Sequence, residues 1–366
     1  MTRIKTKTVV LFFMAVFLSK PPVYDVVAIS VSPLPPCGVT INTIAIDPGR
    51  PDVIYVLTPS GIFGSNVYRS IDSGDNWRAV HKPLSVVGGF FLVVDPKNPQ
   101  IFYAGWNKSI DGGRTWNNID YGQGWSSSFA ISKLIIHPHN SEILYSLATN
   151  GAVYKSINGG ASWAAIGDEQ LGECKAFAID PNNSNVVYGQ FERRSKDIYR
   201  REPIILGGIY KSVDGGATWT SLLPAVGIRE LAVDPGNSAI VYAVNNQHGV
   251  YRSLNGGKQW NTINHGLPER TNISVFAFDP VNPETIYAGT NHGLFTSTNR
   301  DGSWNGWRSI GPESDTRIQT LAINSQNSKI IYVVVSGSRG VFRTTDGGTT
   351  WKPVNNGLPA LPDCPR

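Results

Sequence analysis

The stretch Ser212-Val213-Asp214-Gly215-Gly216-Ala217-Thr218-Trp219 decides the fold, because similar octets recur along the whole 366-residue chain. Seven copies share the pattern Ser/Thr-x-Asp/Asn-x-Gly-x-x-Trp. They end at Trp77, Trp116, Trp163, Trp219, Trp260, Trp304 and Trp351. The sixth copy departs from the pattern, since Asp301 stands where Gly is expected and Trp307–Ile310 matches the following strand better. We therefore expect an insertion to distort the sixth turn.

The octet is a turn followed by a buried aromatic residue. The Ser/Thr hydroxyl and the Asp/Asn side chain can accept backbone N–H groups inside the turn, and Gly supplies a positive φ angle. The Trp ring can then pack between neighbouring sheets. A repeated carboxylate or amide also resembles a metal ligand or a catalytic acid, but turn stabilisation fits every copy. We assign this structural role to Asp72, Asp111, Asn158, Asp214, Asn255, Asn299 and Asp346.

Each octet is one half of a longer repeat. The other half is an apolar run that ends in Asp-Pro, as in Ala232-Val233-Asp234-Pro235, followed by a second run that ends in an aromatic residue. The unit therefore holds four strands, A to D, in about 45 residues, and such repeats close radially into a propeller. Small residues before the Asp favour strand A as the crowded innermost strand. The sequence predicts an all-β fold, a seven-bladed β-propeller of four-stranded antiparallel blades spanning residues 39–356.

The N-terminus is typical of a secretory signal. Arg3, Lys5 and Lys7 precede an apolar run at Val9–Leu18, which is too short for a stable membrane span. We expect a signal peptide over residues 1–28, a lead-in over 29–38 and a C-terminal tail over 357–366, and hence a secreted or periplasmic protein. The net charge of +5 is mild and argues against nucleic acid as a partner.

Two of the three cysteines flank the repeats. In a closed ring Cys37 and Cys364 become neighbours, so a disulfide could join the ends of the circle and add about 4–5 kcal/mol in the chain-entropy model. The alternative is that all three cysteines are free thiols. If the disulfide forms, Cys174 is a small buried hydrophobic residue.

The repeats resemble the Asp-box, or BNR, family, which includes sialidases, xyloglucanase-type glycoside hydrolases, the sortilin ectodomain and photosystem II assembly factors. The resemblance covers the whole mature chain. It implies that the octets lie on the outer rim, away from a ligand face built from the B–C and D–A loops. Because the members of this family perform unrelated functions on one scaffold, the resemblance implies the fold more strongly than the function.

Departures from the repeat concentrate in the expected B–C and D–A loops. The fourth unit expands its B–C loop over Gln190–Glu202, which contains several basic residues, and long insertions are often functional. One interpretation is a basic funnel with aromatic platforms for an anionic glycan or an acidic peptide; the alternative is ordinary surface side chains. The candidate ligand-binding residues are Trp106, Tyr121, Trp125, Lys175, Arg193, Arg194, Arg200, Arg201, Arg229, Arg270 and Arg317.

The sequence favours a binder over an enzyme. Arg229, Arg270 and Arg317 could mimic a sialidase triad, but the expected Arg-Ile-Pro motif is absent and no Tyr–Glu pair stands out. Xyloglucanase-type enzymes use two facing propellers, and this chain has one. No metal-ligand spacing emerges from the histidines. We predict a monomeric, extracytoplasmic, non-catalytic binding or assembly propeller for a protein or glycan ligand, without metal or cofactor. The alternative is a carbohydrate-active enzyme: a sialidase-like or xyloglucanase-like hydrolase or a polysaccharide lyase.

Overall fold

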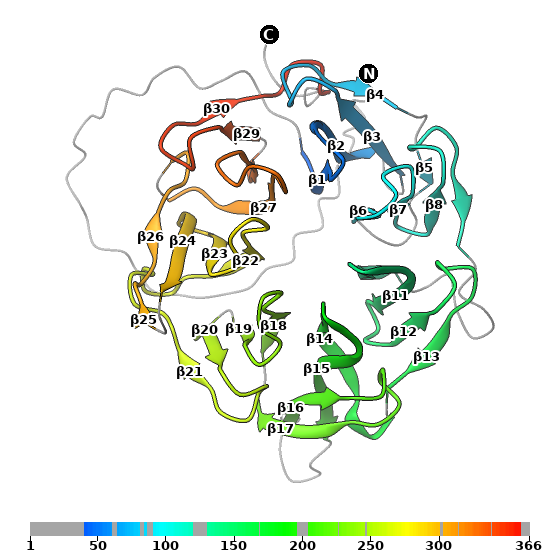
Figure 1. The fold of residues 1–366 in the computed structure, drawn as a ribbon, viewed down its shortest axis with the longest axis vertical. Coiled ribbons are helices and arrows are strands. Elements are labelled where there is room, and N and C mark those ends of the chain that lie inside the picture. Colours follow the sequence, from blue (N-terminus) through cyan, green and yellow to red (C-terminus); the bar gives the residue numbers. More distant parts are fainter. Residues whose placement is uncertain are drawn as a thin grey trace, which may run out of the picture. The chain divides into compact units, whose positions relative to one another are not determined.

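The chain divides into two compact units, residues 1–34 and 35–366, and every described residue lies in the second. The computed structural model describes residues 40–60, 64–80, 84–85, 91–119, 130–167, 169–195, 204–225, 227–245, 247–300, 303–313, 315–337 and 339–359. These residues form seven antiparallel sheets, which are the blades of a β-propeller (Figure 1). The predicted fold class is therefore confirmed.

Blades one to four follow one another along the chain. Blade one contains β1 (Thr43–Asp47), β2 (Arg50–Ser60), β3 (Gly64–Ser70) and β4 (Arg78–Ala79), with β5 (Leu84–Ser85) paired to β3. Blade two contains β6 (Leu92–Val94), β7 (Phe102–Ala104), β8 (Asn107–Ser109) and β9 (Asn117–Asn118). Blade three contains β10 (Ile131–His137), β11 (Asn140–Ala148), β12 (Val153–Ser156) and β13 (Ala164–Ile166). After a 3-10 turn, η1 (Glu169–Leu171), blade four contains β14 (Glu173–Asp180), β15 (Asn183–Ser195), β16 (Ile204–Ser212) and β17 (Thr220–Pro224).

Blades five to seven complete the ring. Blade five contains β18 (Ile228–Val233), β19 (Val241–Asn245), β20 (Gly249–Ser253) and β21 (Asn261–Thr262). Blade six contains β22 (Ile273–Phe278), β23 (Thr285–Thr290), β24 (Gly293–Arg300), β25 (Ser303–Trp304) and β26 (Arg308–Ser309). Blade seven contains β27 (Ile318–Ile323), β28 (Ile331–Val335), β29 (Gly340–Thr344) and β30 (Lys352–Pro353). Each blade uses consecutive strands, and its first strand lies innermost (Figure 1).

The hydrophobic core lies between the blades. Seven clusters of buried side chains each join two neighbouring blades, because a strand presents alternate residues to its two faces and both faces are covered. The cluster between blades seven and one includes Trp77, Tyr332 and Val354, with Leu358 packed against it. The Trp77 indole N–H donates to the Val354 carbonyl at 2.9 Å, and the Tyr332 hydroxyl donates to the Ser73 carbonyl at 3.1 Å. The last blade therefore packs directly on the first.

The octets form closed turns. In blade four the Ser212 hydroxyl accepts the Gly216 N–H at 2.8 Å and donates to Asp214 Oδ1 at 2.7 Å. Asp214 also accepts the Thr218 N–H at 2.9 Å. The Gly215 N–H then donates to the Asn185 carbonyl at 2.8 Å, which ties the octet to the turn between strands A and B. These bonds occupy the carboxylate with its own turn.

The sixth blade contains the expected insertion. Strand β25 pairs with Asn299 and Arg300 at the end of β24, and the fourth-strand position is taken by β26, which pairs with Phe295 and Thr296. The Trp307 indole N–H donates to the Ile263 carbonyl at 2.7 Å, as Trp77 does towards blade seven. Trp307 thus takes the position in this blade that Trp77 takes in blade one, and it is buried.

Candidate functional site

The octets and the A–B turns lie together at one end of the strands. Backbone bonds such as Gly112 N–H to Gln100 carbonyl and Gly256 N–H to Ala239 carbonyl join the two turns within a blade, both at 2.9 Å or less. The B–C and D–A connections therefore form the opposite face, which we call the B–C/D–A face. Side chains on this face are not needed for the octets and A–B turns, which lie at the other end of the strands. Residues that depart from the repeat there are therefore available to bind a ligand.

Blade four rises above this face as a two-stranded ribbon. Strand β14 pairs with β15 up to Glu192, and β17 pairs with β16 from Gly208. Beyond those points the segments 193–195 and 204–206 pair only with each other in the described chain. The sequence predicted a loop over Gln190–Glu202; its residues 190–195 instead continue strand β15, since they find backbone partners in β16.

The base of the ribbon is anchored by side-chain and backbone contacts. Glu192 Oε1 accepts the Gly227 N–H at 2.8 Å and the Gln190 Nε2 amide at 3.0 Å. Gly172 lies so close that a Cβ there would be 2.4 Å from the Glu192 carbonyl oxygen, with φ at +86°. The D–A connections on both sides of blade four thus contact the base of the ribbon, which fixes the position of the ribbon on the face.

A cavity lies on each flank of blade four. The first, of about 360 Å³, is lined by Gly151, Ile166, Glu173 and Phe191 between blades three and four. The second, of about 320 Å³, we call the blade 4–5 groove; it is lined by Ile209, Leu223, Asn245, His248, Tyr251 and Trp260 among others. Sequence reasoning missed this groove, because no single residue in it departs from the repeat. The only indication of the groove in the sequence is Asn245, a small residue at the position equivalent to Phe191 of blade four.

The central channel is narrowed by an ion pair. Lys133 of blade three bonds to Glu230 of blade five, and its ammonium group also lies 3.3 Å from the Phe177 carbonyl of blade four. Below this bridge a cavity of about 370 Å³ is lined mainly by apolar side chains of the innermost strands, including Ile135, Phe177 and Ala232. The charges of Lys133 and Glu230 are therefore paired with each other.

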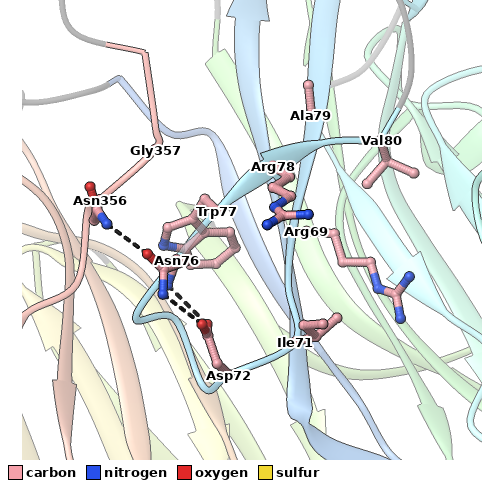
Figure 2. A pocket seen from close by; sticks show the side chains of 10 residues that line it. All are labelled: Arg69, Ile71, Asp72, Asn76, Trp77, Arg78, Ala79, Val80, Asn356 and Gly357. Carbon is pink, nitrogen blue, oxygen red and sulfur yellow. Dashed lines mark hydrogen bonds between the residues drawn. The ribbon is translucent and has the colours of Figure 1, made fainter.

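The fourth cavity, of about 500 Å³, lies beside the octet of blade one, on the side of the octets (Figure 2). Asp72 accepts the Asn76 N–H at 2.9 Å and the Asn76 amide at 2.7 Å. Asn356 donates to the Asn76 side-chain oxygen at 2.7 Å and so connects blade seven to the turn. The polar groups lining this cavity hold the turn and the ring closure together.

The predicted ligand residues do not gather in one place. Arg193 donates to the Gln170 carbonyl at 3.4 Å, and Lys175 pairs with Glu173. Lys175 and Arg229 occupy the same bulge at the start of consecutive innermost strands. Trp106 packs against the cluster between blades two and three. Tyr121, Trp125, Arg200 and Arg201, and the side chain of Arg194, lie outside the described residues.

The three arginines of the sialidase hypothesis do not form a matched set. Arg229 lies at a bulge, Arg317 immediately before β27, and Arg270 in a connection with φ at +57°. All three are exposed. Because they occupy different positions in their blades, the repeat does not present them in a common orientation.

The described cysteine is not an activated thiol. Cys174 is a free, buried thiol, and burial raises its pKa to about 12. Cys37, Cys364 and the side chain of Asn299 lie outside the described residues, so the proposed disulfide stays a prediction.

Acidic and metal-binding groups are sparse in the described cavities. Asp72 is the one carboxylate lining the fourth cavity and Glu173 the one in the first, while the blade 4–5 groove and the channel cavity are lined by none. Across the described ranges no three His, Cys, Asp or Glu side chains are grouped as metal ligands. In the same ranges, no helix has the length and apolar character needed to cross a membrane.

Comparison by sequence finds xyloglucanases. No family model matches the chain. It is 27% identical over 211 residues to a xyloglucanase from Paenibacillus sp, which covers 55% of this chain and 19% of that protein. A xyloglucanase from Hypocrea jecorina is 24% identical over 273 residues, covering 60% of this chain and 32% of that protein. The chain therefore spans only a fifth to a third of the length of these curated relatives.

Comparison by structure finds two kinds of propeller. The GH74 xyloglucanase from Xanthomonas campestris superposes with a TM-score of 0.56 at 15% identity, over 87% of this chain and 61% of that one. YCF48 bound to D1 peptide superposes with a TM-score of 0.55 at 14% identity, over 92% of this chain and 99% of that one. At this identity both similarities establish the propeller fold alone. By sequence, the chain is similar to part of the xyloglucanases.

Proposed function

We propose that this chain is a non-catalytic binding or assembly propeller that captures an extended polypeptide segment on its B–C/D–A face, at blade four. The observation that carries the proposal is the ribbon of residues 193–195 and 204–206, whose two outer edges have no partner strand in the described chain. Unpaired backbone N–H and C=O groups are a template for an added strand. The anchored base places this template at a fixed position.

Charge supports an acidic segment as the ligand. Arg193 belongs to the ribbon and Arg229 lies at the start of β18 in the next blade, and both are exposed. Exposed arginines steer an acidic partner and pair with its carboxylates. The solved YCF48 propeller, which this chain matches over 99% of that protein's length, is described as bound to D1 peptide. The signal-like residues 1–28 support a secreted or periplasmic location.

A carbohydrate-active enzyme is the second candidate, favoured by the sequence similarity to xyloglucanases. A glycosidase usually needs two carboxyl groups about 5–9.5 Å apart around the scissile bond. None of the four described cavities is lined by two carboxylates. A second ring would have to supply the missing group, so this candidate requires a partner propeller.

Selection of displayed random peptides on the purified protein tests the proposal. We expect acidic peptides to be enriched, and their affinity to fall at least about tenfold when residues 194–205 are replaced by a two-residue turn. The matched control is Arg317→Ala, a charge removed from the same face away from the ribbon. Xyloglucan is incubated in parallel and assayed for new reducing ends. Release of reducing ends that is lost in Glu173→Gln or Glu230→Gln would contradict the binder assignment.

A further inference from the structure

Two neighbouring blades share one framework but differ where blade four has Gly189 and Phe191 and blade five has Ala243 and Asn245. In blade four, Gly189 pairs with Tyr210, and Phe191 pairs with Gly208. In blade five, Ala243 pairs with Tyr251, and Asn245 pairs with Gly249. The registers make Phe191 and Asn245 equivalent, and Trp219 and Trp260 close the equivalent octets. The blade 4–5 groove can therefore be compared directly with the space between blades three and four.

In blade four, Phe191 packs an aromatic ring against Tyr210 and Trp219. The ring lies edge-on to Trp219, with centroids 4.9 Å apart, and edge-on to Tyr210 at 5.8 Å. It also covers Gly189, where a Cβ would lie only 2.4 Å from the ring. Phe191 is 2% exposed, so this aromatic cluster is complete without a ligand.

The blade 4–5 groove keeps the two aromatic walls and lacks the ring. Tyr251 and Trp260 are half-buried. The side-chain oxygen of the buried Asn245 accepts the Gln247 and His248 N–H groups at 2.8 and 3.1 Å. The groove retains about 320 Å³ of space, with an apolar floor that includes Ile209 and Ile228. Within the described chain, the Tyr251 hydroxyl and the His248 ring have no hydrogen-bond partner, so both can bond a polar group at the rim.

We propose that the groove receives an aromatic side chain of a bound polypeptide, packed against Tyr251 and Trp260; this rests on the proposed capture of a polypeptide. Edge-to-face contacts with two rings favour an aromatic guest over an aliphatic one. A sugar ring is disfavoured, because its hydroxyls would be buried against Ile209, Leu223 and Ile228 without partners. The backbone of the guest residue can bond His248 and Tyr251 at the rim.

A small probe tests the groove independently of any whole ligand. N-acetyl-phenylalaninamide is added at millimolar concentration to the full-length protein, with N-acetyl-leucinamide and cellotetraose as comparators, and saturation transfer is recorded by NMR. We expect transfer to the aromatic probe to exceed that to the other two. We expect binding of this probe to weaken about tenfold or more in Ala225→Trp, which fills the groove and keeps the backbone bond from the Ala225 N–H to the Gly207 carbonyl.

Two further variants make the result decisive. Ala165→Trp fills the other cavity beside blade four and must leave the aromatic signal unchanged. The double variant Ala243→Gly/Asn245→Phe reproduces the Gly189–Phe191 pair of blade four in the groove and should abolish the signal, with the melting temperature showing that the variant folds. An aromatic signal that survives both groove variants overturns the proposal, as does the absence of any signal from wild type. Stronger transfer to cellotetraose that Ala225→Trp abolishes would make the groove a sugar site and also overturns it.

The outcome is separable from that of the proposed function. If selected peptides bind and depend on the ribbon but are insensitive to Ala225→Trp, polypeptide capture stands and the aromatic assignment falls. If no peptide binds and xyloglucan is cleaved, polypeptide capture falls while the probe experiment still reports whether the groove takes an aromatic ring.

Discussion

At the scale of single residues, the carboxylates of the octets are hydrogen-bonded within their own turns. Asp346 accepts the Thr350 N–H at 2.9 Å and the Thr350 hydroxyl at 2.6 Å, and the Thr344 hydroxyl donates to it at 2.7 Å. Donors directed at the charged form lower the pKa of a carboxyl, and those from Thr350 contribute most in lowering the pKa of Asp346 to about 2. His137, which replaces the Asp of another turn, accepts the His139 N–H at 3.3 Å through Nδ1.

The depressed pKa of Asp346 predicts an acid-sensitive contribution to stability. Its folded pKa, about 2, lies below the unfolded value of about 3.9, so the stabilisation is present above about pH 4 and is lost as pH falls through 2. We expect Asp346→Asn to lower the melting temperature by a constant amount at neutral pH and by a shrinking amount below about pH 4. Thermal melts from pH 7 to about pH 2 measure this; a difference independent of pH throughout would contradict it.

At the scale of elements, the same blade framework serves different purposes according to what lies between the sheets. Phe191 packs against Tyr210 and Trp219 of blade four, whereas Asn245 places no ring against Tyr251 and Trp260 of the blade 4–5 groove. The ribbon arises because β15 and β16 continue to pair after their neighbours end. Comparison of the repeats within the sequence located the insertion in blade four. It did not predict that the inserted residues form strands, because they show no period-2 pattern of apolar residues.

Phe191→Ala should destabilise the protein by about 3–5 kcal/mol, the usual loss when a buried aromatic ring leaves a cavity. The edge-to-face contacts with Tyr210 and Trp219 are lost with it. Urea denaturation followed by intrinsic fluorescence measures the change. The control is Val213→Ala, whose side chain is 66% exposed and should cost less than about 0.5 kcal/mol. Equal effects of the two substitutions would show that Phe191 does not pack as described.

At the scale of the whole propeller, stability depends on joining residues from the two ends of the ring. Trp77 bonds to Val354, and Arg343 of blade seven forms an ion pair with Asp75 of blade one. The chain after β30 adds to this closure, since the Trp77 N–H donates to the Asn356 carbonyl at 2.9 Å. Among the described strands none is exchanged between the first and last blades, so the described contacts between them come from side chains and turns.

Alanine substitutions at two glycines distinguish the effect of ring closure on stability from the effect of local backbone strain. Gly357 has φ at +88° and a Cβ there would lie 2.3 Å from the Trp77 carbonyl oxygen, whereas Gly347 has φ at +74° with open space around it. An alanine costs about 1–2 kcal/mol at either site through its φ angle. We expect Gly357→Ala to cost about 1–3 kcal/mol more, as overpacked sites do. Denaturant titration of both variants measures this; equal losses would show that the contact with Trp77 does not hold the ring closed.

The sequence by itself determined the fold class, the number of blades and the place of the insertion, because turn chemistry and strand periodicity are local properties repeated in register. Only the tertiary structure decided where a ligand has room. The blade 4–5 groove depends on the summed volumes of side chains from two blades. No sequence motif marks such a groove, because it results from a large side chain that is missing. Likewise Trp307 could be matched to its strand from the sequence, but its bond to Ile263, 44 positions earlier, follows from how neighbouring blades pack.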